Sequence, residues 1–323
     1  MRVTYVLIGG SMKHKKEESQ IDKIVLAATL YYKNNLSQQE IANRLNVSRP
    51  WVSKLLTRAQ EMGIVQITIH SPVSGDDQLE RSLKEKYGIT HVSVISQTED
   101  NKDYISQAMA NYFISQVQSG DIIGVGWGNA VSRFINELIP VQVKDVQIVP
   151  MAGSFGTTFE TLPNYSAIQL ANKLEGHAKV LHAPAFCADE KEYETLMQNQ
   201  SVSTTLDLAQ HADIIVTGIG TFGSSFLTKH DILSDENVQD LKDQHAIGDI
   251  ILQFLDHEGH PVVVESTRYL IKADIFQARK NARSILAMAQ GVEKKEIIHT
   301  VLSLGLVDAF FTDKETALAL LEG

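Results

Sequence analysis

Residues 77–323 alternate between short apolar runs and amphipathic stretches, and this alternation restricts the possible folds more than any other feature of the chain. The apolar runs are His91–Ser96, Asp121–Gly128, Val146–Gly153, Ala178–Phe186, Ala212–Gly220, Asp249–Leu255, Ile285–Gly291 and Ala309–Asp313. Helical periodicity lies between them, for example over 79–87, 104–118, 167–174 and 296–304. Continuous apolar strands that alternate with helices are typical of a parallel sheet covered on both faces. We therefore predict an α/β body with a mostly parallel, Rossmann-like sheet.

Glycines gather at the ends of three apolar runs, the edge at which such folds bind ligands. The segments are Gly124–Gly128, Ala152–Thr158 and Gly218–Gly223. Their backbone N–H groups could face an anion, or the glycines could serve only tight strand-to-loop turns. Gly218, Gly220 and Gly223 also spell G-x-G-x-x-G, but no helix pattern opens on Gly223 and no ribose-binding acid follows at the usual distance. We therefore expect no dinucleotide and no other cofactor.

The segment before the body carries the pattern of three short helices. The first spans 21–34, with a predicted buried stripe of Ile21, Ile24, Val25, Ala28, Tyr31 and Tyr32. Ser37 stands three residues before Glu40, which predicts a capping box at the start of a second helix.

The third helix is predicted to begin after Ser48 as its N-cap, with Pro50 in the first turn and Gly63 at the end. Val52, Leu55, Leu56 and Ala59 would face inward. The alternation over Ile64–Ile69 indicates the strand of a wing. Together these patterns predict a winged helix-turn-helix over residues 16–72, which we call the head.

The outer face of the third helix combines cations with hydroxyl donors, which suits phosphates and base edges of double-stranded DNA. We expect Arg49 and Lys54 to read bases, while Gln38, Ser53 and Arg58 hold phosphates. Trp51 either contacts DNA or packs against the wing. The candidate DNA-binding residues are Gln38, Ser48, Arg49, Trp51, Ser53, Lys54 and Arg58. A three-helix protein-interaction module would share the core pattern but would not account for this basic face.

Charge separates the head from the body. Residues 1–75 hold ten Lys and Arg against five Asp and Glu, whereas residues 76–323 hold nineteen against thirty-four. A basic head on an acidic body indicates that only the head approaches a polyanion. One cysteine, Cys187, excludes an internal disulfide framework and fits a cytoplasmic protein. No apolar run is long enough for a membrane helix, so we expect no membrane partner.

The polar segment Ser71–Asp77 reads as the boundary between the head and a body domain over 77–323. Residues 1–15 show no helical pattern and are expected to form a disordered extension. The codons for residues 8–10 can contain a ribosome-binding sequence, so translation is expected to begin at Met12. The alternative is a short arm that contacts the minor groove through Arg2.

The whole pattern resembles the SorC family of bacterial sugar-responsive transcription regulators, also called DeoR-like sugar-binding regulators. The resemblance begins near Ile21 and rests on five segments: SQQEIANRLNVSRP (37–50), DIIGVGWG (121–128), TGIG (217–220), AIGDI with FLDxxG (246–259) and TDKETA (312–317). It implies a body similar to sugar-phosphate isomerases and deaminases, a phosphorylated sugar or similar effector, and assembly as a homotetramer. It further implies a repressor of a carbohydrate-use operon.

The resemblance also assigns candidate effector contacts. The family's phosphate loop falls on Gly126–Ala130, with Asn129-Ala130 where many members carry two threonines, and its late lysine falls on Lys294, after Gln290 in place of a glycine. Asp249 matches an acid that contacts effector hydroxyls, with a turn cap as its alternative role. Ala152 replaces the lysine that forms a Schiff base in one subset. The candidates are Gly126, Trp127, Gly128, Asn129, Gly153, Ser154, Gly218, Gly220, Asp249 and Lys294.

Two other functions stay open at this point. One is a working sugar-phosphate isomerase or deaminase fused to the head, although no acid and base pair is evident from the spacing. The other is a regulator that has lost its ligand, which the changes at Asn129-Ala130 and Gln290 would allow. The histidines His177, His182 and His211 lack metal-ligand spacing, so no metal site is expected.

Overall fold

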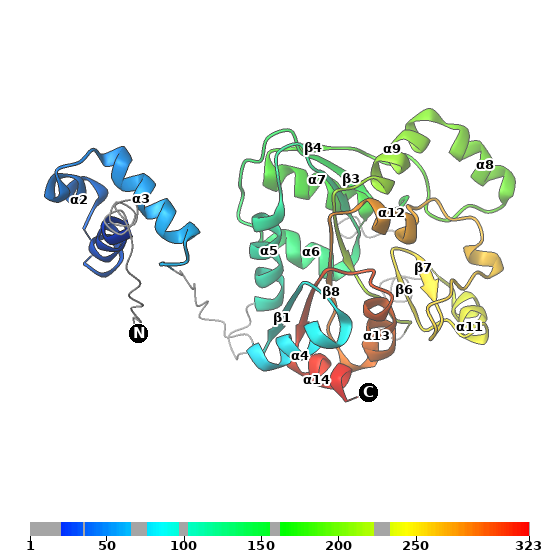
Figure 1. Cartoon of the computed structure of the whole chain (residues 1–323). Helices are drawn as coiled ribbons and strands as arrows, with labels where there is room; N and C mark the ends of the chain where they lie inside the picture. Colours follow the sequence, from blue (N-terminus) through cyan, green and yellow to red (C-terminus); the bar gives the residue numbers. More distant parts are fainter. Residues whose placement is uncertain are drawn as a thin grey trace. The chain divides into compact units, whose positions relative to one another are not determined.

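The computed structural model describes residues 21–34, 36–65, 76–96, 103–155, 162–222 and 233–322. The chain divides between Ser71 and Pro72 into two compact units, for which we keep the names head and body (Figure 1). The extension 1–15, the wing beyond Val65, most of the segment joining the units, the end of the second glycine segment and Gly223 lie outside the described residues.

The described part of the head consists of three helical segments. Residues 21–28 are α-helical and continue as a π-helix, η1 (Thr29–Lys33), and then come α2 (Gln38–Leu45) and α3 (Arg49–Glu61). A positive φ of 53° at Asn46 turns the chain from α2 into α3. A core of buried apolar residues joins the three: Ile24, Ala27, Ala28, Leu30, Ile41, Ala42, Val52, Leu55, Leu56 and Ala59.

The predicted capping box at α2 is confirmed. Ser37 Oγ accepts the backbone N–H of Glu40 at 3.2 Å, and Glu40 Oε2 accepts the backbone N–H of Ser37 at 2.8 Å. At α3 the prediction was half right. Ser48 occupies the N-cap position, but its side chain makes no capping hydrogen bond.

The buried stripe of the first helix also differs from the prediction. Ile24 and Ala28 are buried as expected, but Ile21 and Val25 are 42% and 41% exposed, and Tyr32 is exposed as well. With 3.6 residues per turn, Ile21 and Val25 lie about 60° and about 100° around the helix from Ile24. They therefore stand at the rim of the stripe that α2 and α3 cover.

The described body is built on a seven-stranded sheet in which every neighbouring pair is parallel, as predicted. The order is β1-β9-β8-β5-β2-β3-β4. The strands are β1 (His91–Ile95), β2 (Ile122–Val125), β3 (Gln147–Pro150), β4 (His177–Ala178), β5 (Ile214–Gly218), β8 (Ser284–Met288) and β9 (Ala309–Asp313). Their carboxyl ends meet at one edge of the sheet.

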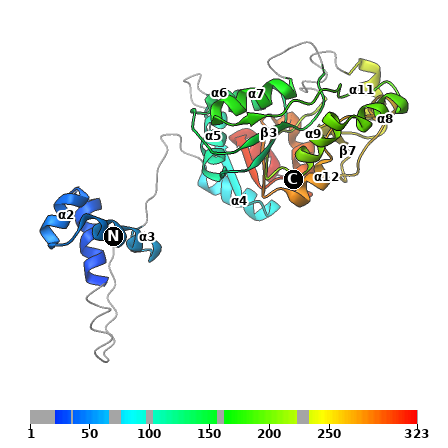
Figure 2. The ribbon, with the colours of Figure 1, turned by 90° about the horizontal axis from the view of Figure 1, so that it is seen from above.

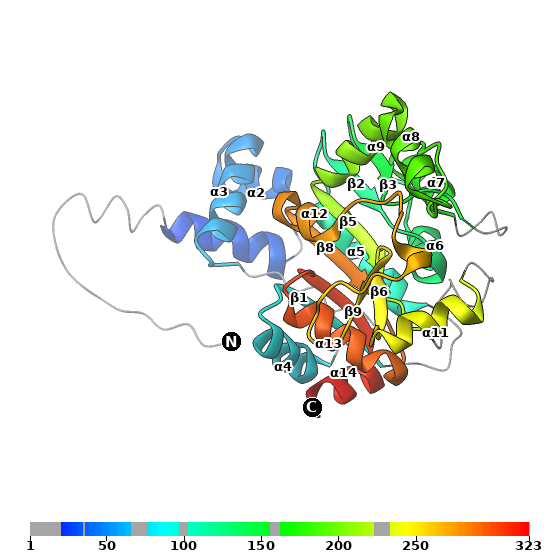
Figure 3. The same ribbon diagram turned by 90° about the vertical axis from the view of Figure 1, so that its right-hand side faces the viewer.

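Helices cover both faces of the sheet. One face packs against α5 (Tyr104–Gln116), α6 (Gly128–Glu137) and α7 (Pro163–Leu174). The other packs against α4 (Asp77–Tyr87), α9 (Gln200–Gln210), α12 (Ile275–Asn281), α13 (Lys295–Ser303) and α14 (Lys314–Leu321). Figure 3 shows α4, α13 and α14 together beside β1 and β9. The remaining described helices are α8 (Glu190–Gln198), α11 (Asp235–Asp243), η3 (Glu265–Thr267) and η4 (Val292–Lys294).

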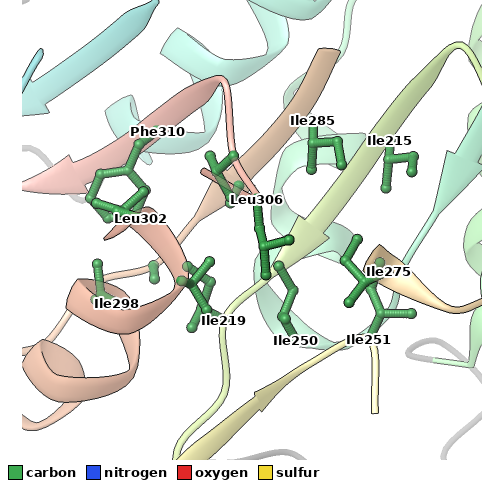
Figure 4. Packing of buried hydrophobic residues seen from close by; sticks show 14 of the residues in the cluster. Ile215, Ile219, Ile250, Ile251, Ile275, Ile285, Ile298, Leu302, Leu306 and Phe310 are labelled. Atoms are coloured by element: carbon green, nitrogen blue, oxygen red, sulfur yellow. The ribbon is translucent and has the colours of Figure 1, made fainter. Parts of the chain in front are cut away.

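Neighbouring residues of one strand supply the two cores. Ile214 of β5 packs with the cluster of α5, α6 and α7, whereas Ile215 packs with the opposite cluster. Ile215 lies there beside Ile285 and near Ile275 (Figure 4). Because side chains alternate across a strand, both must be apolar when both faces are covered, which explains the continuous apolar runs.

Two of the predicted strands were wrong in extent or in kind. The run Ala178–Phe186 contributes only Ala178, the second residue of β4, to the sheet and continues through isolated bridges. The run Asp249–Leu255 forms a separate antiparallel hairpin of β6 (Gly248–Ile250) and β7 (Gln253–Leu255). Ile251 and Leu252 turn this hairpin at φ values of 52° and 54°, which apolar residues rarely adopt, so the sequence did not reveal the turn.

Candidate functional site

The third helix of the head presents a polar, basic face. Arg49, Ser53, Lys54 and Arg58 are exposed, while the opposite side of α3 is buried in the head core. Ser48 is exposed too, and its hydroxyl is not used as a helix cap. This arrangement leaves cations and hydroxyls together on one helix face.

Trp51 has a different position from its neighbours. Its ring is half-buried and packs against the head core, and Lys23 Nζ lies 5.9 Å from the ring centroid. Gln38, the first residue of α2, is also half-buried. Packing thus accounts for part of the Trp51 surface, although the wing lies outside the described residues.

In the body, the loop after β2 leads directly into α6. The Gly126 N–H donates to Val216 O at 2.8 Å, and a Cβ at Gly126 would lie 3.3 Å from the same oxygen. Gly128 has a φ of 87°, which favours glycine. Trp127 is the N-cap of α6, so the free N–H groups of the first helical turn follow immediately.

A cavity of about 720 Å³ opens beside this helix start. Its wall comes from α6, from α7 and from the segment after β8: Asn129, Ala130, Ser132, Arg133, Ile135, Asn136, Tyr165, Ser166, Gln169, Met288, Ala289, Gln290, Glu293 and Lys294. Among the predicted effector contacts, Asn129 and Lys294 line this cavity together. They are far apart in the sequence, and the parallel order of the strands brings them to the same edge.

Two cations line the cavity. Lys294 Nζ donates to Ile219 O at 3.2 Å, which holds its side chain at the end of β5. Arg133 Nε lies 3.4 Å from Asp103 Oδ2, and 40% of the Arg133 side chain is exposed. Arg133 was not among the predicted effector contacts. Helical spacing could have indicated it, because Asn129, Arg133 and Asn136 share one face of α6.

In the described parts of the other two glycine segments, the N–H groups of Gly153, Ser154 and Gly220 donate to backbone carbonyls. The N–H groups of Gly153 and Ser154 donate to Ile271 O and Ala183 O, each at 2.9 Å. Gly220 and Asp249 exchange two backbone hydrogen bonds of 2.9 Å. A Cβ at Gly153 would lie 2.4 Å from Pro184 O. Gly153 and Gly220 therefore serve close approach of neighbouring backbone segments. Gly218 does not line the cavity either.

Asp249 is buried and does not line the cavity. Its Oδ2 accepts the Leu252 N–H at 3.2 Å, the contact of a turn cap in the β6–β7 hairpin. Burial raises the pKa of Asp249 to about 6, although the charges of Lys294 and Lys272 oppose the rise. Lys272, another residue that the sequence analysis missed, donates from Nζ to Gln253 Oε1 at 3.1 Å. Burial lowers the pKa of Lys272.

Among the described residues, no three acidic, histidine or cysteine side chains gather to hold a metal ion. None of the described helices is long and apolar enough to cross a membrane.

The fold and these two sites define a class, a transcription regulator with an effector-binding body. Residues 71–322 match the family model described as "Putative sugar-binding domain". The chain therefore belongs to the SorC family of regulators that carry this domain, as the sequence resemblance predicted.

Several relatives match over nearly the full length. A deoxyribonucleoside regulator of Bacillus subtilis is 31% identical over 316 residues, which cover 96% of this chain and 99% of the relative. An erythritol catabolism regulatory protein of Brucella abortus is 25% identical over 301 residues, which cover 91% and 95%. The crystal structure of the full-length sorbitol operon regulator SorC from Klebsiella pneumoniae is 28% identical, with a TM-score of 0.71 and coverage of 94% and 99%. The chain is classed with these regulators, not with enzymes.

Proposed function

We propose that this chain represses a carbohydrate-use operon and that a phosphorylated sugar in the body cavity controls its affinity for operator DNA. The cavity carries the effector part of the proposal. Its wall combines Arg133 and Lys294 with the start of α6, where free backbone N–H groups and the helix dipole favour an anion. Asn and Gln side chains on the same wall suit sugar hydroxyls.

The charge of the effector follows from the contrast between the cavity and its surroundings. The body is acidic overall, whereas the cavity wall carries two cations, Arg133 and Lys294, against one acid, Glu293. Arg133 and Lys294 come from different elements, α6 and η4, and an anion bound between them would draw these elements together. An uncharged sugar would gain little from either cation.

The head supplies the DNA-binding part of the proposal. Arg49 and Lys54 near the start of α3 would enter the major groove. Gln38, Ser53 and Arg58 would contact the phosphates, with Ser48 as a further contact to DNA. A recognition helix reads one half-site, so paired heads on an oligomer, which we propose to be a cytoplasmic tetramer, would read a repeated operator. Effector binding would act by changing how paired heads fit their half-sites.

A thermal-shift screen of the full chain tests the effector. Pentose and hexose phosphates are compared with the same sugars unphosphorylated, because a ligand present at about 100 times its Kd adds about 2.7 kcal/mol to the free energy of unfolding. We expect stabilisation by a phosphorylated sugar and none by its unphosphorylated form. Stabilisation by unphosphorylated sugars alone, or by neither group, would contradict the proposal.

Matched variants locate the binding. Lys294→Met and Arg133→Met should each abolish the thermal shift and leave operator affinity without effector unchanged. Lys295→Met is the control, because this lysine adjoins Lys294 in the sequence but does not line the cavity. An unchanged shift in Lys294→Met would exclude the cavity as the effector site.

A further inference from the structure

The first described residue of the body and the wall of the cavity are both connected to the same strand, β9. Asp76 is the first described residue after 66–75, the segment that leads from the head. Its N–H donates to Val94 O at 3.1 Å, and the next residue of β1, Ile95, lies opposite Asp313 of β9. The entry point of the body is therefore fixed at the carboxyl end of β9.

The side chain of Asp76 makes two contacts. One carboxylate oxygen accepts the Leu79 N–H at 3.3 Å and caps α4, and the other lies 3.1 Å from Lys314 Nζ. The hydrogen bond from Lys314 is the largest cause that lowers the pKa of Asp76. Lys314 is the first residue of α14 and directly follows Asp313.

On the other side, Asp313 and Thr316 hold the segment that forms part of the cavity wall. The Gly291 N–H donates to Thr316 Oγ1 at 2.8 Å and to Asp313 Oδ2 at 3.3 Å. Asp313 in turn accepts the Thr316 N–H at 2.7 Å and the Thr316 hydroxyl at 3.0 Å. Thr316 is fully buried, and Lys294 follows Gly291 by three residues, with its N–H bonded to Gly291 O at 3.0 Å.

We propose that Asp313 and Thr316 are positioning residues that hold the Lys294 segment. Through Lys314 and Asp76, they couple the occupancy of the cavity to the point where the chain from the head enters the body. This inference rests on the proposed function, because it assumes that the effector pulls on Lys294. These contacts form a path from Gly291 to Asp76, and the buried hydrogen bonds around Thr316 are its rigid part. The Lys314–Asp76 ion pair, with side chains 48% and 26% exposed, is the part that can break and re-form.

Hydrogen exchange of the full chain, without any ligand, tests the path. Thr316→Val removes the nearer of the two acceptors of the Gly291 N–H and the hydroxyl bond to Asp313, while the 3.3 Å contact with Asp313 Oδ2 remains. We expect exchange to rise about fivefold, the scale of one hydrogen bond, both at Gly291–Lys294 and at the Asp76 and Leu79 amides. Thr300→Val is the matched control, because Thr300 is also buried but bonds to His257 O outside the path. A rise confined to Gly291–Lys294, or an equal rise at Leu79 in the control, would overturn the proposal.

A double-mutant cycle then isolates the ion pair. In a Lys314→Gln background, Thr316→Val should still raise exchange at Gly291–Lys294 but should no longer change it at Leu79. If Thr316→Val still raises hydrogen exchange at Leu79 in this background, the coupling runs through the β1–β9 pairing and the assignment of Lys314 is wrong.

Inorganic phosphate serves as the ligand probe. In the unaltered chain, saturating phosphate should slow exchange at both Gly291–Lys294 and Leu79, and in Lys314→Gln only at Gly291–Lys294. Slowing at Gly291–Lys294 alone in the unaltered chain would overturn the coupling. If phosphate gives neither slowing nor a thermal shift, the anion site fails, while the ligand-free comparison still decides the coupling.

Discussion

At the scale of single residues, burial raises the pKa of the Asp249 carboxyl, a shift that its sequence neighbours do not indicate. The side chain caps the β6–β7 turn through Leu252, and burial raises its pKa to about 6. Lys272 and Lys294 lie near enough to oppose this rise. Asp249 therefore changes charge close to neutral pH.

This pKa predicts a pH dependence of stability. Between about pH 4 and pH 6 the folded body holds a proton that the unfolded chain has released, so the free energy of unfolding falls as the pH rises through this window. The loss is about 2–3 kcal/mol, since one pKa unit corresponds to about 1.4 kcal/mol. Asp249→Asn keeps an acceptor for Leu252 and should lack this loss. Urea unfolding of both proteins at pH 4 and pH 7 measures it, and parallel pH profiles would contradict the assigned pKa.

The exposed cations of α3 give a second prediction at this scale. Arg49→Ala should weaken binding to an operator selected in vitro by roughly 1–3 kcal/mol and relax base preference at one position. Arg58→Ala should weaken binding to every sequence and reduce its salt dependence. Binding titrations on the operator and on random DNA distinguish them. Equal behaviour of the two variants on both DNAs would refute the division into base-reading and phosphate-binding residues.

At the scale of elements, the sequence predicts those helices and strands whose conformation depends mainly on their own residues, and not those that depend on packing with distant segments. The parallel strands were predictable because burial on both faces requires continuous apolar runs, as at Ile214 and Ile215. The β6–β7 hairpin was not, because its turn places Ile251 and Leu252 at positive φ, which only the surrounding packing makes tolerable. Helix starts were predictable where capping residues recur, but not whether the Ser48 hydroxyl would be used.

The same reasoning applies to the candidate effector site. Asn129 and Lys294 were found through resemblance, and the sheet order unites them at one cavity. Arg133 was missed because an arginine on an amphipathic helix is expected to be solvent-exposed unless its neighbours in space are known. The roles of Gly153 and Gly220 depend on backbone hydrogen bonds from distant segments, which no local pattern reveals.

The two serines before the head helices provide a prediction about these elements. Ser37→Ala removes a hydrogen-bonded cap of α2 and should cost the head about 1 kcal/mol of unfolding free energy. Ser48→Ala should change the unfolding free energy of the head by no more than a few tenths of a kcal/mol, because the Ser48 hydroxyl caps no helix. This variant should lower DNA affinity instead. Thermal unfolding and DNA titration of both variants check this. Equal destabilisation by both changes would contradict the described caps.

At the scale of the whole molecule, the chain consists of two compact units with separate cores (Figure 2). The head core is a small cluster within three helices, whereas the body has apolar clusters on both faces of its sheet. Units with separate cores can unfold independently.

Calorimetry of the full chain should therefore resolve two transitions. A stabilising sugar phosphate should raise only the transition of the body, since a ligand stabilises the unit to which it binds. Ser37→Ala, as the reciprocal control, should lower only the transition of the head. A single transition that moves as one in both experiments would contradict the independence of the two units.

The position of β1 has a consequence for the synthesis of the chain. In the described sheet β1 pairs only with β9, and roughly 210 residues of chain separate the two strands. The head, by contrast, makes its contacts within a short stretch and can fold as it leaves the ribosome. During most of its translation, a growing chain can thus contain a folded head, while β1 stays unpaired until β9 has been synthesised. A message that ends before Ala309 would yield a protein that retains the head but can never complete its sheet.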